Sequence, residues 1–156
     1  MIVRTVLAVL AALALVAAAQ PAVHHATRTR DAAALRTNAD EFADSVRALA
    51  RRSDPGRTLA TAPRRTLDLV VPDGATLAVR GEPARLVTRL DGAPAHRRSL
   101  ATRVVTCTDD GTLEGPTTLA YVRTASGPVV FALRGFIRGN ASIGVHACAP
   151  STVQAR

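Results

Sequence analysis

The chain contains 156 residues, which is enough for one domain with short appendages. Hydrophobic residues make up 47% of it but aromatic residues only 3%, so a core has to be built from valine, leucine and alanine. Such a core buries little area per residue, which indicates modest stability. The net charge is +8, and every basic residue other than histidine is an arginine.

These arginines are scattered, often in pairs, with acidic residues between the pairs. Nucleic-acid sites usually contain a dense basic run or aromatic residues on which bases stack, and neither feature occurs here. A genome of high GC content, in which arginine codons displace lysine codons, accounts equally well for the composition. The charge pattern therefore argues against nucleic acid as the partner.

The N-terminus carries a hydrophobic targeting segment. Residues 5–19 are apolar and rich in alanine, and they follow the single charge of Arg4. One interpretation is a cleaved signal peptide that uses Ala17-Ala18-Ala19 as its small-residue site. The other is an uncleaved anchor over residues 2–23, with Arg4 reaching the membrane surface and Pro21 kinking the exit. Both interpretations place the rest of the chain at or across a membrane.

The charges around this segment give a weak orientation signal. Arg4 and the α-amine lie on one side, whereas Arg28, Arg30 and Arg36 lie on the other. Taken alone, this bias favours a C-terminal part that faces the cytoplasm. The cysteine pair and the glycosylation sequence described below favour the opposite side, and we give them more weight.

An amphipathic helix is predicted from about Thr27 to Arg52, where Ser53-Asp54-Pro55-Gly56 ends it. Its apolar residues recur at spacings of three and four and form one narrow stripe. The stripe consists of Ala32, Leu35, Ala39, Phe42, Val46 and Leu49. Leu35, Ala39, Phe42, Val46 and Leu49 could form an assembly seam with another chain, or the stripe could lie on the protein's own sheet domain. A stripe of fewer than three heptads is short for an autonomous coiled coil, which favours the second interpretation.

A flexible Pro/Arg/Thr linker is predicted over residues 55–64. After it, the apolar residues no longer recur at helical spacing but alternate at every second position, as in a β-strand. Alternation and turn residues predict strands around residues 66–71, 77–79, 86–90, 99–106, 117–123 and 129–136. Short strands at this spacing are typical of a small antiparallel β-sandwich or rolled sheet. No helical crossover fits between the strands, which argues against a parallel sheet.

The clearest hairpin is the last one. Residues 117–123 and 129–136 flank the turn sequence Ala125-Ser126-Gly127-Pro128. Leu119 and Tyr121 fall on one face of the first strand, and we expect Phe131 and Leu133 of the second strand to meet them.

Cys107 and Cys148 are the two cysteines. In an oxidising compartment they would form a disulfide that ties the tail to the sheet and contributes on the order of 4 kcal/mol. The alternatives are two free thiols, or a metal site completed by His146. The metal site lacks the second close pair of ligands that makes a zinc motif specific, so we expect the disulfide.

Asn140-Ala141-Ser142 matches the N-glycosylation sequence, which can be used only outside the cytoplasm. No sequence pattern indicates catalysis: there is no phosphate-binding glycine loop, no metal-binding histidine pair on a helix and no nucleophile elbow. We therefore expect a protein that is not an enzyme and has no cofactor and no metal.

Several segments together resemble a known group of proteins. They are the opening residues 1–10, the early Pro21, the charged alanine-rich helix, residues 63–72 and the closing strand at residues 127–131. Over residues 1–135 the chain resembles small haloarchaeal membrane-anchored proteins of unknown function whose genes accompany type IV pilus or secretion machinery. The resemblance implies a pilin-like plan, in which a hydrophobic helix continues as an amphipathic rod and ends in a β head. Only residues 1–4 precede the hydrophobic run, so we expect an accessory component rather than a processed pilin.

The sequence therefore predicts an α+β protein with five segments. They are a membrane anchor or signal (1–23), an amphipathic helix (24–54), a linker (55–64), an antiparallel β domain (65–136) and a tail (137–156). The expected role is a non-enzymatic accessory or structural component of a type IV pilus or secretion-like assembly. It would have a single N-terminal span, an extracytoplasmic β domain, and either machinery proteins or a second copy as partners through the helix. The alternatives are a secreted or anchored β-domain binding module, and a cytoplasm-facing basic domain that binds nucleic acid or anionic lipid.

Overall fold

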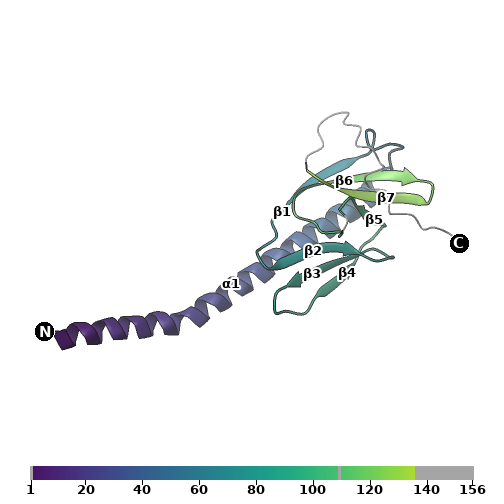
Figure 1. Ribbon diagram of the computed structural model, residues 1–156. Coiled ribbons are helices and arrows are strands. Elements are labelled where there is room, and N and C mark those ends of the chain that lie inside the picture. The colour runs from purple at the N-terminus through teal and green to yellow at the C-terminus, as the bar shows by residue number, and fades with distance from the viewer. Residues whose placement is uncertain (1, 109, 136–156) are drawn as a thin grey trace. The chain divides into compact units, whose positions relative to one another are not determined.

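The structure is a computed structural model that describes residues 2–108 and 110–135 (Figure 1). The chain divides into two compact units, Met1–Ala33 and Ala34–Arg156. The described residues contain one long helix and seven strands, which confirms the predicted α+β class.

Helix α1 spans Ile2–Arg52 without interruption. The predicted amphipathic helix is therefore the second half of a longer helix, and the hydrophobic segment forms the first half, as expected. Pro21 lies inside α1 rather than at an exit from it, although its missing N–H removes one hydrogen bond of the helix. Two turns later, the hydroxyls of Thr27 and Thr29 donate to backbone carbonyls four residues earlier, at 3.0 and 2.9 Å.

The part of α1 in the second unit contributes one face to a hydrophobic core. This face contains Leu35, Ala39, Phe42, Val46 and Leu49, all at most 8% exposed. These five side chains are buried within the protein's own domain, as the second interpretation of the stripe expects, so they are not exposed for the alternative assembly seam. The helical period identified the right residues but could not specify which surface covers them.

Seven strands form two sheets (Figure 1). The four-stranded sheet has the order β1-β6-β7-β5, with β1 at Arg64–Leu69, β6 at Gly115–Thr124, β7 at Gly127–Arg134 and β5 at Val104–Thr106. The three-stranded sheet has the order β2-β3-β4, with β2 at Ala75–Arg80, β3 at Arg85–Leu90 and β4 at His96–Ser99. Both sheets contribute to the core that α1 completes, with Leu69, Leu77, Leu86 and Val130 at most 1% exposed. The part of α1 that carries Leu35 to Leu49 is thus an integral part of the core.

Two predictions about the strands are wrong. Residues 99–106 do not form one strand: β4 ends at Ser99 in one sheet, and β5 begins at Val104 in the other. In addition, β5 pairs with β7 in parallel, with Val104 opposite Val130. No helical crossover is needed for this pair, because the chain passes through β6 between the two strands.

The β6–β7 hairpin is confirmed, but its faces differ from the prediction. Leu119 lies opposite Ala132 and Tyr121 lies opposite Val130, and all four side chains belong to the core that contains α1. Phe131 and Leu133 point to the other face, where they pack in a second cluster with Ala120, Val122, Leu59 and Ala62. Both faces of β6 and β7 are buried, so the sequence lacks the alternation that would identify the core face.

The segment before β1 packs on the sheet, in contrast to the predicted flexible linker. Gly56 donates to the carbonyl of Tyr121 at 3.0 Å and accepts from Arg123 at 2.8 Å, so it bridges to β6. A Cβ atom on Gly56 would lie 2.5 Å from the Cα of Ala62, so this close approach requires glycine. Leu59 and Ala62, each 8% exposed, cover the second cluster.

Candidate functional site

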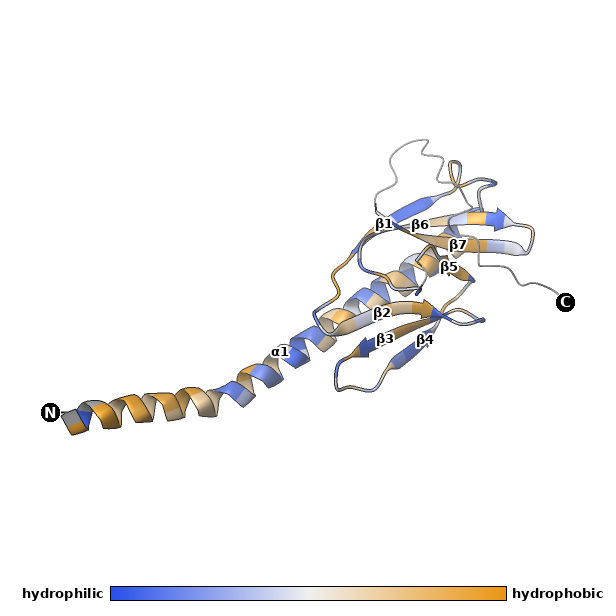
Figure 2. Ribbon diagram, in the orientation of Figure 1, coloured by the Kyte–Doolittle hydropathy of each residue, from blue (hydrophilic) through white to orange (hydrophobic). Residues whose placement is uncertain are grey.

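The first half of α1 is the part of the described chain whose length and composition suffice to cross a membrane. Between Arg4 and Arg28 the sequence contains no aspartate, glutamate, lysine or arginine. This interval of α1 is about 35 Å long at 1.5 Å per residue, against roughly 30 Å for the hydrocarbon core of a bilayer. Its large apolar side chains are exposed, from 52% for Val6 to 72% for Leu15. Figure 2 shows the apolar colour around the whole first part of the helix.

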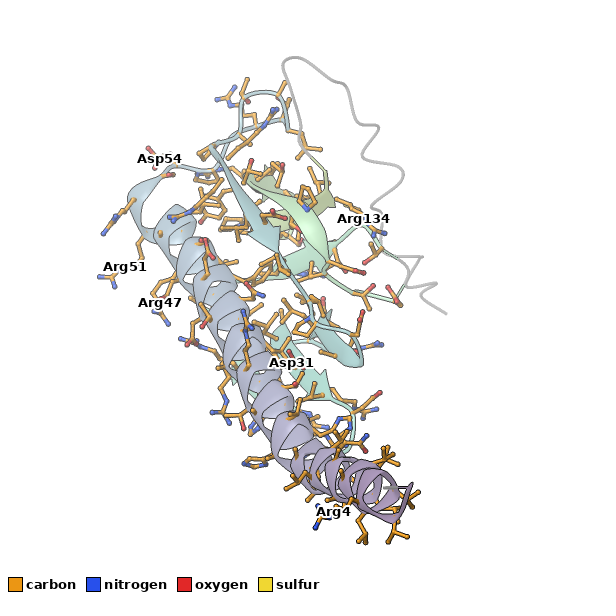
Figure 3. The ribbon with its side chains drawn as sticks, turned by 90° about the vertical axis from the view of Figure 1, so that its left-hand side faces the viewer. Arg4, Asp31, Arg47, Arg51, Asp54 and Arg134 are labelled. Carbon is orange, nitrogen blue, oxygen red and sulfur yellow. The ribbon has the colours of Figure 1, made fainter. Side chains whose placement is uncertain are left out.

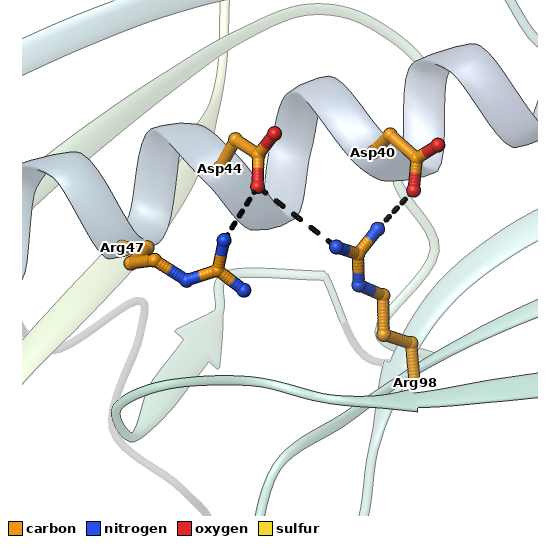
Figure 4. Close-up of polar contacts among 4 residues, drawn as sticks. All are labelled: Asp40, Asp44, Arg47 and Arg98. Atoms are coloured by element: carbon orange, nitrogen blue, oxygen red, sulfur yellow. Dashed lines mark hydrogen bonds and ion pairs between the residues drawn. The ribbon is translucent and has the colours of Figure 1, made fainter.

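An ion-pair network joins α1 to the three-stranded sheet (Figure 4). Arg98 on β4 forms an ion pair with Asp40, and its guanidinium also lies 3.9 Å from Asp44. Asp44 in turn pairs with Arg47 on the next turn of the helix, at 2.9 Å. These groups neutralise one another, which indicates a structural role rather than a binding site.

A polar groove of about 650 Å³ lies beside the last turns of α1, next to β1. Its lining residues are Glu41, Asp44, Ser45, Arg47, Ala48, Arg51, Arg52 and Arg65. We call this the arginine groove. In Figure 3, Arg47 and Arg51 project from the side of α1 that faces away from the strands. The groove is larger than the two other hollows described below, which measure about 420 and 260 Å³.

The arginines of this groove differ in their partners. Arg47 is paired with Asp44. Arg51, Arg52 and Arg65 form no ion pair and donate no side-chain hydrogen bond to any residue that the structure describes. Three arginines without an ion-pair partner among the described residues, two from α1 and one from β1, therefore line one concave surface.

Two smaller hollows border the three-stranded sheet. One, of about 420 Å³, lies between residues 81–84 and 100–104, and its lining includes Arg103 and Glu82, which form an ion pair. The other, of about 260 Å³, lies between α1 and β4 and includes Arg36, His96 and Arg97. Neither contains a buried polar group without a partner among the described residues.

The other predicted site residues are only partly described. Cys107 is half-buried and disulfide-bonded. Cys148, His146 and Asn140 lie outside the described residues, so the pairing of the cysteines and the glycosylation site stay predictions. Within residues 2–108 and 110–135, no group of three histidine, cysteine, aspartate or glutamate side chains is placed to hold a metal ion.

The arginine pairs are apparent from the sequence, but the arginine groove is not. Arg51-Arg52 and Arg64-Arg65 are apparent in the sequence as scattered basic pairs, yet Arg52 and Arg65 line one surface because α1 ends beside β1. Ser45 was not predicted as a site residue either. Its position between the apolar residues Phe42 and Val46 was the available signal, since a serine there falls near the buried face.

No curated protein and no solved structure matches this chain. A protein-family model matches residues 2–135, that is, both the apolar half of α1 and all seven strands. The match spans most of the chain, and the protein therefore belongs to the family described as Domain of unknown function (DUF7311).

Proposed function

We propose that this protein is a non-enzymatic accessory or structural component of a membrane assembly of the type IV pilus or secretion type. It is held by one uncleaved N-terminal span and displays its α+β domain on the extracytoplasmic side. The observation that carries the proposal is the continuity of α1, whose exposed apolar first half leads directly into the helix that completes the domain core.

The exposed apolar surface of α1 supports an anchor. A soluble protein rarely leaves a contiguous apolar surface of more than a few hundred Å² in water, and such a surface marks a membrane or protein contact. Helix α1 also runs through Ala17, Ala18 and Ala19 without a break, so the small-residue site lies within regular helix. Helix α1 includes both the span and the first part of the domain, so an uncleaved span would keep the domain attached to the membrane.

The disulfide at Cys107 supports the extracytoplasmic side. Disulfides persist in oxidising compartments and are rare where cellular reductants keep thiols reduced. This argument opposes the mild bias of Arg28, Arg30 and Arg36. We give it more weight, because one arginine and an α-amine on the other side make that bias small.

The role in an assembly needs a contact surface other than the buried face of α1. Within a membrane, small residues spaced by four allow helices to approach closely. The pairs Ala8 and Ala12, and Ala14 and Ala18, have this spacing on the exposed part of α1. Partner helices of the assembly would pack here, which leaves the β domain free on the outside.

Membrane anchoring is tested by mass spectrometry of the mature chain and by membrane fractionation. We expect an intact segment before Gln20, and we expect Leu10→Arg and Leu13→Arg together to release the protein from the membrane, because each charge is costly in the bilayer centre. Arg89→Gln on β3 is the matched control and should leave fractionation unchanged. A mature chain that begins at Gln20 would refute the anchor.

The assembly role is tested separately by Ala8→Leu with Ala12→Leu. These substitutions retain the apolar character of the span, so the protein should remain in the membrane while co-purification of machinery proteins falls. Retained co-purification would contradict the proposed contact.

A β-domain binding module is a second candidate, and the arginine groove favours it. This function is compatible with an anchored domain, because the groove belongs to the folded unit that begins at Ala34.

A further inference from the structure

The arginine groove contains positive charge that the described residues leave uncompensated. Arg51, Arg52 and Arg65 have exposed side chains and no ion-pair partner, while Glu41 is the one lining carboxylate without a partner in the described part of the chain. Three positive charges and one negative charge leave a net charge of +2. Asp44 and Arg47 add nothing to this charge because they are paired with each other.

A structural role accounts for only part of this cluster. Arg51 and Arg52 lie in the last turn of α1, where positive charge interacts favourably with the negative end of the helix dipole. Arg65 belongs to β1, and no helix end explains its charge. It lies on the same face of its strand as Leu67 and Leu69, so its side chain extends along the side of α1.

Ser45 provides an independent indication of a ligand. It is 1% exposed and lines the arginine groove. Its hydroxyl is the one buried side-chain polar atom without a hydrogen-bond partner among the described residues. A buried hydroxyl that makes no hydrogen bond is destabilising, and such groups in native proteins call for an explanation such as a bound partner.

We propose that the arginine groove binds a phosphate or sulfate dianion, with Arg52 and Arg65 as charged donors and Arg51 as a further positive charge on the rim. Ser45 becomes a neutral donor when its buried hydroxyl turns towards the groove. The net charge of +2 matches a dianion. One guanidinium group can donate two parallel hydrogen bonds to two oxygens of an anion, and several donors along one groove suit a tetrahedral group with four oxygens better than a carboxylate with two. The site does not depend on the membrane anchor or on the assembly proposed above.

The test is calorimetric titration of the full chain, in micelles of an uncharged detergent, with inorganic phosphate and sulfate. Saturable binding is expected for both, and much weaker binding for acetate. Arg52→Gln and Arg65→Gln should each weaken phosphate binding by at least about 10-fold, because each removes a charge-assisted donor. Arg89→Gln makes the same change of charge on β3, outside the groove, and should change the affinity by less than about 2-fold.

Ser45→Ala separates a ligand-binding role from a structural one. It should weaken phosphate binding by roughly 3-fold to 10-fold, because it removes one neutral donor. The thermal midpoint without phosphate should be unchanged or raised, since the substitution deletes an unsatisfied buried hydroxyl. A structural serine would give the opposite pattern, with unchanged binding and a lower midpoint.

The group could be a free anion or part of a lipid headgroup. The titration is repeated in nanodiscs that contain phosphatidic acid, a phosphomonoester, and in nanodiscs made equally negative with phosphatidylglycerol, a monoanionic phosphodiester. Equal phosphate affinities in the two indicate a free anion, and a lower affinity with phosphatidic acid indicates a competing headgroup. Either result supports the site. The proposal is overturned if phosphate does not saturate, if acetate binds as tightly, or if Arg89→Gln weakens binding as much as Arg65→Gln.

Discussion

Arg98 on β4 is ion-paired with Asp40 on α1, so the edge strand of the three-stranded sheet is tied by charge to the helix (Figure 4). Arg98 lies opposite Leu86 in the β3–β4 register, which places it on the face of the sheet that meets the core. Its aliphatic stem therefore covers apolar residues while its guanidinium reaches the helix carboxylates at the rim. The pair joins two elements that are 58 residues apart in the sequence.

Arg98→Gln should lower the free energy of unfolding by about 0.2–1 kcal/mol, the range for exposed ion pairs. The effect is small because the side chains of Arg98 and Asp40 are 39% and 65% exposed. Urea unfolding can be followed by the fluorescence of Tyr121, the single tyrosine in a chain without tryptophan, which is 6% exposed in the core. High salt should reduce the difference between the variant and the parent protein. Arg97→Gln is the control, and an equal loss there would contradict a specific role for Arg98.

Phe42→Ala should lower the free energy of unfolding by about 3–5 kcal/mol, because it removes a large fully buried side chain and leaves a cavity. Phe42 is 0% exposed and packs with residues of both sheets. Glu41→Ala changes the neighbouring exposed residue and should stay within about 0.5 kcal/mol of the parent protein. The same urea experiment measures both. If Phe42 served an intermolecular seam instead, the isolated protein would keep its stability and only its self-association would change.

The helix and most strands could be predicted because their periodic patterns are local. Leu67 and Leu69 alternate with exposed residues, so β1 is apparent from the sequence. The strand β4 is not, because His96, Arg97 and Arg98 are polar and the strand exists through its pairing with β3. Its role depends on residues that are distant in sequence, which a local pattern does not contain.

The arginine groove could be predicted even less well from the sequence. Arg52 and Arg65 are 13 positions apart, and their meeting in one groove depends on where α1 ends relative to β1. Leu59 shows the same limit, because its burial against the second cluster depends on the bridge from Gly56 to Val122. Both features follow from tertiary packing, so no composition or spacing rule reveals them.

Gly111→Ala should destabilise the protein by more than the cost of its backbone conformation alone. Gly111 has a φ of 69°, and a Cβ atom there would lie 2.5 Å from the carbonyl oxygen of Val79 on β2. The Gly111 carbonyl also accepts a hydrogen bond from Val79 at 2.9 Å, so the approach cannot relax without loss of that bond.

Gly92 has a φ of 74° but open space around it, which makes Gly92→Ala the matched control. We expect about 1–2 kcal/mol for Gly92→Ala and at least about 1 kcal/mol more for Gly111→Ala, measured by urea unfolding. Equal losses would contradict the importance of the contact.

Asp110 should titrate at a pH below the ordinary value of 3.8 for an aspartate. The hydroxyl of Thr112 donates to the Asp110 carboxylate at 2.7 Å, and the Thr112 backbone N–H donates to it at 3.1 Å. Both bonds favour the ionised form and therefore lower the pKa of Asp110. The positive charge of Arg80 lowers the pKa by a smaller amount. Because the pKa is lower in the folded state, this group stabilises the fold above the unfolded pKa and loses that contribution as the pH falls through the folded pKa. The effect on stability is small since the carboxylate is exposed, so the titration itself is the measurement.

A carboxyl-carbon NMR titration should show a midpoint below 3.8 for Asp110. Thr112→Val should raise that midpoint towards the ordinary value, and Arg80→Gln should raise it less. A midpoint that Thr112→Val leaves unchanged would show that the hydroxyl does not hold the carboxylate in solution.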